Sequence, residues 1–161
     1  DPETYSGLGL ETRPDVREAA GPVGGLREAL AWARERALPG ALVVACDMPF
    51  VSTRLLDALW RMSAHADVAV PESDGPRGLE PLCAAYRTSC QGAIERALER
   101  DDLRVIGFFD DVDVRRVPAS EVAALADPER AFFNVNTTGD LKRARAMAAE
   151  SEAARSAETT S

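Results

Sequence analysis

An aspartate directly after an apolar run is the residue of this sequence whose position most favours chemistry. Asp47 follows Ala41–Cys46, six small or apolar residues that are typical of a strand buried on both faces of a parallel sheet, and Pro49 then ends the strand. Open α/β sheets bind ligands at the carboxyl ends of their strands. A carboxylate there can hold a divalent cation on nucleotide phosphates, although a carboxylate that caps a turn gives the same pattern.

A glycine-rich turn comes before the first helical pattern. Gly21, Pro22, Gly24 and Gly25 stand where a base or sugar could approach the backbone at a helix amino end. The turn lacks the Gly-Lys-Ser/Thr ending of a phosphate-binding P-loop, and it does not match Gly-x-Gly-x-x-Gly. On its own it therefore favours a tight turn.

Two asparagines stand near the end of the last expected strand, residues 131–136. Asn134 and Asn136 are two positions apart, so both side chains would leave the same face of that strand. Such an amide pair can bind a sugar hydroxyl, a metal-bound water or a phosphate. Thr137 and Asp140 have the spacing of a capping box, so the segment alone favours helix capping.

The remaining polar candidates are weaker. Arg77, in the turn-rich loop before Glu80, could offer a guanidinium fork to phosphate, although a surface turn explains this loop as well. His65 is the only histidine, and we expect it to cap a helix or face solvent. This position excludes a histidine base and a histidine-rich metal site.

Composition narrows the class of protein. The chain has 161 residues, enough for one domain, and a net charge of −8, which argues against broad nucleic-acid binding. No segment has the length and apolarity of a membrane span or the pattern of a signal peptide. Cys46, Cys83 and Cys90 lie in or beside apolar segments without metal-ligand spacing, which predicts buried thiols in a reducing cytoplasm.

Strands and helices alternate along the sequence, which predicts an α/β domain over residues 1–149 with a mainly parallel sheet. We expect three layers with Leu42–Cys46 as the central strand. Residues 150–161 are rich in Ala, Ser, Glu and Thr without periodic apolar positions, so we expect a disordered tail.

The order of four segments is more specific than any one of them. Gly-Pro-Val-Gly-Gly-Leu, Cys-Asp-Met-Pro-Phe, Glu-Pro-Leu-Cys-Ala-Ala-Tyr and Phe-Phe-Asn-Val-Asn-Thr follow one another here. This series resembles the MobA-type molybdenum cofactor guanylyltransferases, from about Tyr5 to about Ala148. The resemblance implies a Rossmann-like nucleotidyltransferase fold that joins GMP from GTP to molybdenum-bearing molybdopterin and releases pyrophosphate, with molybdoenzymes or their chaperones as further partners.

Residue roles follow from this resemblance by motif position. It implies that Asp47 is a catalytic Mg²⁺ ligand that also contacts GTP, that Asp15 contacts GTP together with the turn from Gly21 to Gly25, and that Asn134 and Asn136 line the active site near the pterin. The family opens with a strand and a glycine-rich loop that carries an arginine and a lysine. No such loop stands here, so we expect a chain truncated at its amino end and inactive by itself.

Two other functions remain open at this point. A related transferase could use CTP or another acceptor, since the loops that contact the base decide that choice. A module that binds a nucleotide or a protein partner without catalysis would also fit a chain that lacks the phosphate loop.

Overall fold

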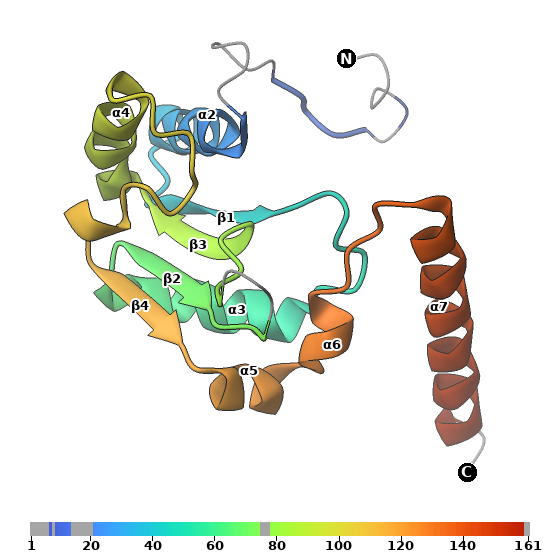
Figure 1. Ribbon diagram of the computed structural model, residues 1–161. Coiled ribbons are helices and arrows are strands. Elements are labelled where there is room, and N and C mark those ends of the chain that lie inside the picture. Colours follow the sequence, from blue (N-terminus) through green and yellow to red (C-terminus); the bar gives the residue numbers. More distant parts are fainter. Residues whose placement is uncertain (1–6, 8, 14–20, 75–77, 160–161) are drawn as a thin grey trace.

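Four strands form a mixed sheet in the computed structural model, which describes residues 7, 9–13, 21–74 and 78–159 (Figure 1). They are β1 (Gly40–Val44), β2 (Val68–Pro71), β3 (Cys83–Arg87) and β4 (Val114–Val117), in the order β1-β3-β2-β4. β3 runs antiparallel to both β1 and β2, whereas β2 and β4 are parallel. Three strands therefore share one direction, as expected of a mainly parallel sheet, and β3 opposes them.

Helices cover both faces of the sheet, which confirms the three-layer α/β arrangement (Figure 1). One face carries α2 (Gly21–Glu35) and α4 (Gln91–Glu99), and the other carries α3 (Thr53–Met62), α5 (Ala119–Leu125) and α6 (Pro128–Ala131). Short 3-10 turns η2 (Ser63–His65), η3 (Thr88–Cys90) and η4 (Phe109–Asp111) connect them. Helix α4 buries Ala93, Ile94, Ala97 and Leu98, which lie on one face of the helix.

Strands β2 and β3 are each buried on both faces, and β3 shows the alternation most clearly. Ala84 and Tyr86 face the apolar cluster under α2 and α4, whereas Cys83 and Ala85 face the cluster under α3 and α5, and all four are fully buried. Successive side chains of a strand point to opposite faces, so β3 joins the two halves of the core.

Strand β1 does not have the central position that we expected. It lies at an edge of the described sheet and pairs only with β3, and Leu42 and Val44 are each 39% exposed. An apolar run indicates that a segment forms a strand and favours burial. Whether that strand is central or at an edge depends on the other strands that pair with it.

The segment 131–136 is also not a strand. Helix α6 begins after Asp127, whose carboxylate accepts a hydrogen bond from the Glu129 amide, and Pro128 occupies the first turn. The chain is then irregular up to α7 (Thr138–Thr159). Aromatic and β-branched residues produced the strand pattern here, yet they serve a loop that packs its rings against a second loop.

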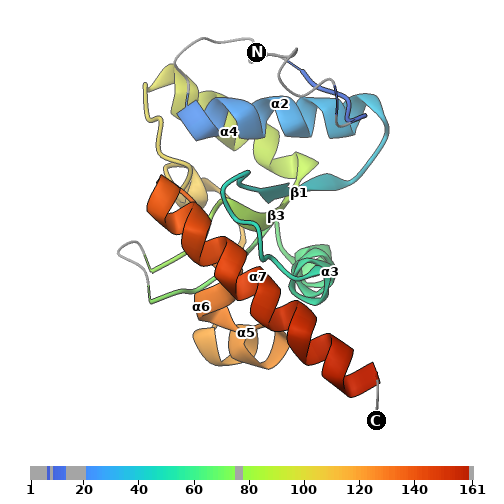
Figure 2. The same ribbon diagram turned by 90° about the vertical axis from the view of Figure 1, so that its right-hand side faces the viewer.

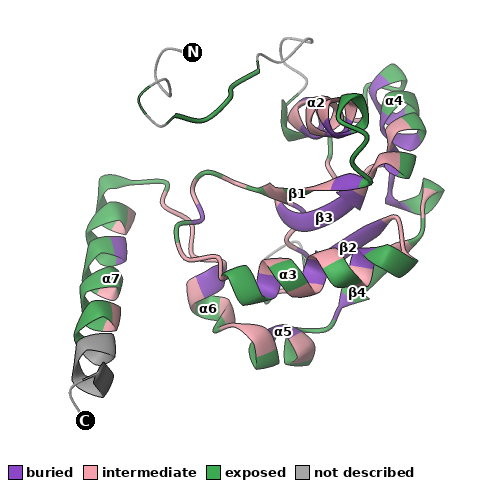
Figure 3. Ribbon diagram, turned by 180° about the vertical axis from the view of Figure 1, so that it is seen from behind, coloured by how far each residue is buried: buried purple, intermediate pink, exposed green. Residues whose placement is uncertain are grey.

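Helix α7 continues through residues that we expected to be disordered, because it runs to Thr159. Alanine, glutamate and arginine favour helix even without an apolar stripe. Helix α7 lies at the outside of the molecule, beyond the sheet and the helices that cover it (Figure 2). Most of its described residues are exposed, and Ala144 is its buried one (Figure 3). The Arg130 side chain donates to the Met147 carbonyl at 3.0 Å and ties α7 to α6.

Candidate functional site

Asp47 lies three residues beyond the carboxyl end of β1, in a turn that leads to α3. The turn is closed by the Met48 amide, which donates to the Ala45 carbonyl at 3.2 Å. The Ala45 amide in turn donates to the Leu82 carbonyl at 2.8 Å. Asp47 therefore shares one end of the sheet with Glu80-Pro81-Leu82, the segment that leads into β3.

The carboxylate of Asp47 is poorly satisfied by the protein itself. Its Oδ1 atom is buried, and within the described part of the chain it has no hydrogen-bond partner. A buried carboxylate oxygen without a partner is costly, so a proton donor or a cation normally accompanies it. Oxygen is also the ligand atom that Mg²⁺ prefers. This oxygen therefore fits a divalent cation.

Asp47 is the acidic side chain that the described part of the chain brings to this end of β1 as a candidate metal ligand. No group of three acidic, cysteine or histidine residues comes together as a metal site in the described ranges. Mg²⁺ in nucleotide sites is commonly held by one or two carboxylates with substrate phosphates and water. One carboxylate at the end of a strand agrees with that pattern.

The asparagine segment lies directly against Asp47. The Val135 amide donates to the Asp47 carbonyl at 2.9 Å, so Asn134 and Asn136 flank a residue bonded to the aspartate. Their side chains have different surroundings. Asn134 Nδ2 donates to the Phe132 carbonyl at 3.0 Å, whereas the exposed Asn136 uses its backbone amide toward Asp140 Oδ2 at 3.3 Å. The segment is not a strand, so the two asparagine side chains do not leave one strand face as we expected.

Aromatic rings hold the two loops together. The rings of Phe50 and Phe133 lie 6.3 Å apart between centroids. The Arg130 guanidinium lies 4.5 Å from the centre of the Phe50 ring, and Arg143 lies 5.0 Å from that of Phe133. These aromatic and cation–π contacts hold the loop after Asp47 against residues 132–136 and the first turns of α7.

The expected capping box is present at the start of α7. Asp140 Oδ2 accepts from the Thr137 amide at 3.0 Å and from its hydroxyl at 2.8 Å, and the Asp140 amide donates to Thr137 Oγ1 at 3.1 Å. The hydrogen bond from the Thr137 side chain lowers the pKa of Asp140. The box explains why the irregular segment stops at Thr137.

The glycine-rich segment, which alone favoured a tight turn before the helix, instead forms the first residues of α2, with Gly21 at a φ of +58° and Pro22 in the first turn. Gly24 is buried, Gly25 is half-buried and Gly21 is exposed. Pro22 lines a cavity of about 390 Å³ together with Pro81, Leu103, Arg104, Val105 and Ile106. The amino end of α2 therefore lies at the same end of the sheet as Asp47. Pro22 shares this cavity with Pro81, and the next residue, Leu82, accepts the hydrogen bond from the Ala45 amide.

Sequence reasoning missed Arg104. It offered Arg77 as the guanidinium for phosphate, but Arg77 and Asp15 lie outside the described residues. The apolar pattern of residues 104–109 fits a helix and a strand equally well, and the structure has turns at 105–108. A short Asp102-x-Arg104 spacing was the signal that could have indicated a local ion pair.

The three cysteines differ from one another. Cys83 and Cys90 are buried as expected, and burial raises the pKa of each thiol to about 12, with smaller contributions from Glu80 and Asp67 respectively. Cys46 is exposed, contrary to expectation, because it follows the edge strand β1 rather than a central one.

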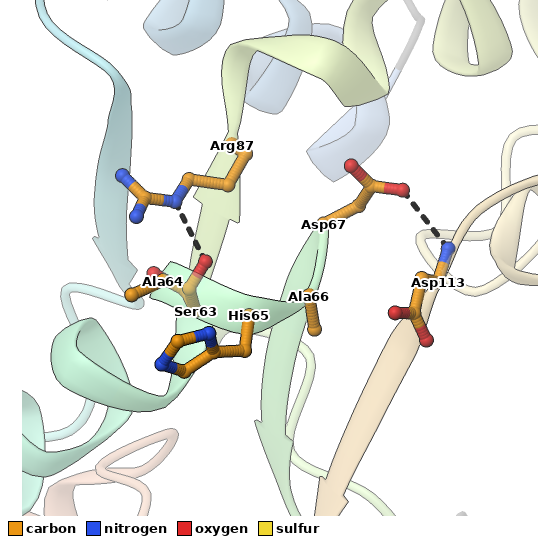
Figure 4. A pocket seen from close by; sticks show the side chains of 7 residues that line it. All are labelled: Ser63, Ala64, His65, Ala66, Asp67, Arg87 and Asp113. Atoms are coloured by element: carbon orange, nitrogen blue, oxygen red, sulfur yellow. Dashed lines mark hydrogen bonds between the residues drawn. The ribbon is translucent and has the colours of Figure 1, made fainter.

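A second hollow lies at the other end of the sheet, where β3 ends and β2 begins (Figure 4). His65 is exposed there beside Asp67, Arg87 and Asp113. The charged groups mostly bond within the protein: Asp67 accepts from the Ser89 hydroxyl and the Asp113 amide, and Arg87 Nε donates to the Ser63 carbonyl at 2.7 Å. This hollow therefore has a structural explanation and is separate from the Asp47 site.

An α/β sheet with a carboxylate beyond the carboxyl end of one strand and a helix amino end beside it has the arrangement of a nucleotide-binding α/β protein. Residues 1–112 match the sequence-family model of the MobA-like NTP transferase domain. The chain belongs to this family of nucleotidyltransferases, and the expected enzyme class is confirmed.

Curated relatives carry a more specific name. The chain is 43% identical over 148 residues to a probable molybdenum cofactor guanylyltransferase of Pelotomaculum thermopropionicum, covering 92% of this chain and 70% of that protein. A protein of the same name from Methanosarcina mazei is 38% identical over 130 residues, which span 80% of this chain and 56% of the relative.

Solved structures agree with the fold. The molybdopterin-guanine dinucleotide biosynthesis protein A of Archaeoglobus fulgidus superposes with a TM-score of 0.75 at 28% identity, over 93% of this chain and 76% of that one. A protein of Aquifex aeolicus has a TM-score of 0.67 at 23% identity, which supports the fold alone. Within the described residues, no helix combines the length and apolarity needed to cross a bilayer.

Proposed function

We propose that this chain acts as a molybdenum cofactor guanylyltransferase, which transfers GMP from GTP to molybdopterin that carries molybdenum and releases pyrophosphate. The observation that carries the proposal is the buried, unpartnered Oδ1 of Asp47 at the end of β1, bonded through its backbone to the Asn134–Asn136 segment. The names of the relatives support the choice of substrates.

The terminal phosphate of the pterin would attack the α-phosphorus of GTP, and pyrophosphate would leave in line. Such a transfer needs positioning and neutralisation of charge more than it needs a covalent nucleophile. Accordingly, no side chain of this protein is assigned as a nucleophile. Bound Mg²⁺ would supply charge neutralisation on the triphosphate, and Asp47 would hold it through its carboxylate.

The other residues would bind and orient the substrates. Gly21, Pro22, Gly24 and Gly25 would let GTP approach the amino end of α2, and we retain Asp15 as a further GTP contact. Asn136 would present its amide to the pterin or to a metal-bound water, and Asn134 would support the loop that carries it. We also propose a cytoplasmic location, which suits the free thiols of Cys83 and Cys90.

Nucleotide choice tests the proposal in the intact protein. With Mg²⁺ present, GTP is expected to raise the melting temperature more than CTP or ATP at equal concentration, since only the folded state binds the nucleotide. Formation of a guanylylated pterin product from GTP would establish the reaction. Equal shifts from the three nucleotides would remove guanine selectivity, and a larger shift with CTP would assign the related cytidylyl transfer.

A further inference from the structure

Arg104 and Asp102 form a local ion pair beside the cavity at the α2 amino end. Arg104 Nε donates to Asp102 Oδ1 at 2.9 Å and Nη2 donates to Oδ2 at 2.7 Å, which is a side-on, two-point contact. The Arg104 backbone amide also donates to Oδ1 at 3.2 Å. The hydrogen bond from the Arg104 side chain, followed by that from the Arg104 backbone amide, lowers the pKa of Asp102 to about 2. The carboxylate therefore stays ionised at neutral pH.

The Asp102 carboxylate occupies the space in which a side chain at Gly107 would begin. A Cβ atom on Gly107 would lie 2.5 Å from both Cγ and Oδ2 of Asp102 and 2.7 Å from Oδ1. Gly107 is not among the residues with a positive φ, so its backbone would accept alanine and the requirement is one of space. The Gly107 amide donates to the Arg104 carbonyl at 2.9 Å and closes the turn. Gly107 thus makes room for the ion pair and fixes its backbone.

The pairing leaves one side of the guanidinium available. A side-on contact uses Nε and one hydrogen of Nη2, so both hydrogens of Nη1 and the second hydrogen of Nη2 remain. Within the described ranges the Arg104 side chain hydrogen-bonds and ion-pairs with Asp102 alone, and the more distant Asp110 carboxylate acts on it only through its charge. Those remaining donors match two oxygens of a phosphate. An arginine that is already held by Asp102 also loses less rotamer freedom when it binds.

The cavity beside Arg104 has apolar walls. Leu103 and Ile106 are each 37% exposed, and Pro22 and Pro81 complete the lining. At about 390 Å³ the cavity has the size and the apolar lining of small-molecule sites, in which a few polar groups fix the orientation of the ligand. Its chemistry suits a flat heterocycle with a phosphate attached.

We propose that Asp102 and Gly107 are positioning residues, which hold the Arg104 guanidinium at this cavity to receive the phosphate of a heterocyclic substrate. The inference rests on the proposed function, because both GTP and the pterin acceptor combine a flat heterocycle with phosphate. Arg104 itself would touch the substrate, whereas Asp102 and Gly107 act through Arg104.

Steady-state kinetics in the intact protein test the proposal, with KM measured separately for GTP and for the pterin acceptor. Arg104→Ala is expected to raise one of the two KM values by about tenfold or more, the loss of a hydrogen bond to a charged group. Asp102→Asn and Gly107→Ala should raise the same KM by about three- to tenfold with kcat nearly unchanged. Because both act on one ion pair, the double variant should be no worse than the single ones.

Asp113→Asn is the matched control, since it removes the same charge from an exposed residue at the other end of the sheet. It should leave both KM values unchanged. The substrate whose KM rises identifies the source of the phosphate.

A second readout does not depend on activity. Nitrogen-15 relaxation at Arg104 Nε should show an ordered side chain in the unaltered chain and in Asp113→Asn, and a mobile one in Asp102→Asn and Gly107→Ala. If Arg104→Ala raises a KM but Asp102→Asn changes neither that KM nor the order at Nε, the positioning role is wrong. If Arg104→Ala raises neither KM, the phosphate contact is wrong. If the unaltered protein transfers no guanylyl group, the proposed function fails, and the relaxation data still decide whether Asp102 orders Arg104.

Discussion

The backbone amide of Val135 donates a hydrogen bond to the carbonyl oxygen of Asp47 at 2.9 Å, across 88 positions of sequence. This bond joins the turn after the edge strand β1 to the irregular segment before α7. Phe50 and Phe133 pack beside it, 6.3 Å apart between ring centroids. The aspartate and the asparagine pair therefore form one unit, and changes on either side of this bond should report on the other.

Replacement of the aspartate separates catalysis from folding. Asp47→Asn keeps the shape of the side chain and removes its charge, so turnover in the intact protein should fall by about two to three orders of magnitude. The melting temperature without metal should not fall, because the variant no longer buries an unpartnered carboxylate oxygen. Any rise in melting temperature that Mg²⁺ and nucleotide give the unaltered protein should shrink. Asp57→Asn, exposed on α3, is the control, and near-normal turnover of Asp47→Asn would make Asp47 a turn residue only.

The two asparagines should behave differently when each is replaced by alanine. Asn134→Ala removes the bond from Nδ2 to the Phe132 carbonyl, so the free energy of unfolding should fall by about 1 kcal/mol and activity should fall as well. Asn136→Ala removes an exposed side chain whose backbone amide keeps its bond to Asp140, so only activity should fall. Urea unfolding and turnover measured on both variants check this. A loss of stability in Asn136→Ala equal to that in Asn134→Ala would contradict the assignment.

The three thiols should react at very different rates. Cys46 is exposed, whereas Cys83 and Cys90 are buried with thiol pKa values raised to about 12. Because the thiolate is the nucleophile, one thiol per folded chain should react rapidly with a disulfide reagent near pH 8, and all three should react in urea. Cys46→Ser should abolish the rapid phase. Rapid reaction of that variant would place a second thiol at the surface.

The buried thiols also predict a loss of stability at alkaline pH. In the unfolded chain they ionise near pH 9, whereas burial keeps them neutral in the folded state to about pH 12. The folded state then binds more protons than the unfolded state, so the free energy of unfolding falls as pH rises above 9, by about 1 kcal/mol per thiol between pH 9 and 10. Urea unfolding at pH 8, 9 and 10 measures this. The double variant Cys83→Ala, Cys90→Ala should have a shallower slope, and an unchanged slope would contradict the prediction.

The sequence was most informative where local physical rules decide the outcome. The buried residues of α4 have helical spacing within its own sequence, Ser52 accepts a bond from the Leu55 amide at the start of α3, and Thr137 with Asp140 forms the expected capping box. Asp47 lies after a strand as its flanking residues indicate. These features depend on neighbours within a few positions, so one stretch of sequence contains the information.

Long-range pairing decided the features that were not predicted. The apolar run of β1 is equally compatible with a central and an edge strand, and only the pairing of β3 with both β1 and β2 places it at the edge. Residues 131–136 have the composition of a strand, but Phe133 packs on Phe50, which is far away in sequence, and the segment forms a loop. Arg104 lies at a cavity that Pro22 and Pro81, both distant in sequence, also line, so its place there could not be predicted from its neighbours. Such partners are set by the fold as a whole.

The position of β3 between β1 and β2 also has a consequence during synthesis, because β1 leaves the ribosome before its pairing partner β3. β1 has no hydrogen-bond partner in the described sheet until β3, which begins roughly 40 residues later, and at about 5 to 20 residues per second this is a delay of about 2 to 8 seconds. During that interval the Ala41–Val44 run is an unpaired apolar strand, the kind of segment that associates with other chains. The nascent protein should therefore depend on chaperones or on rapid synthesis most strongly between the emergence of β1 and that of β3.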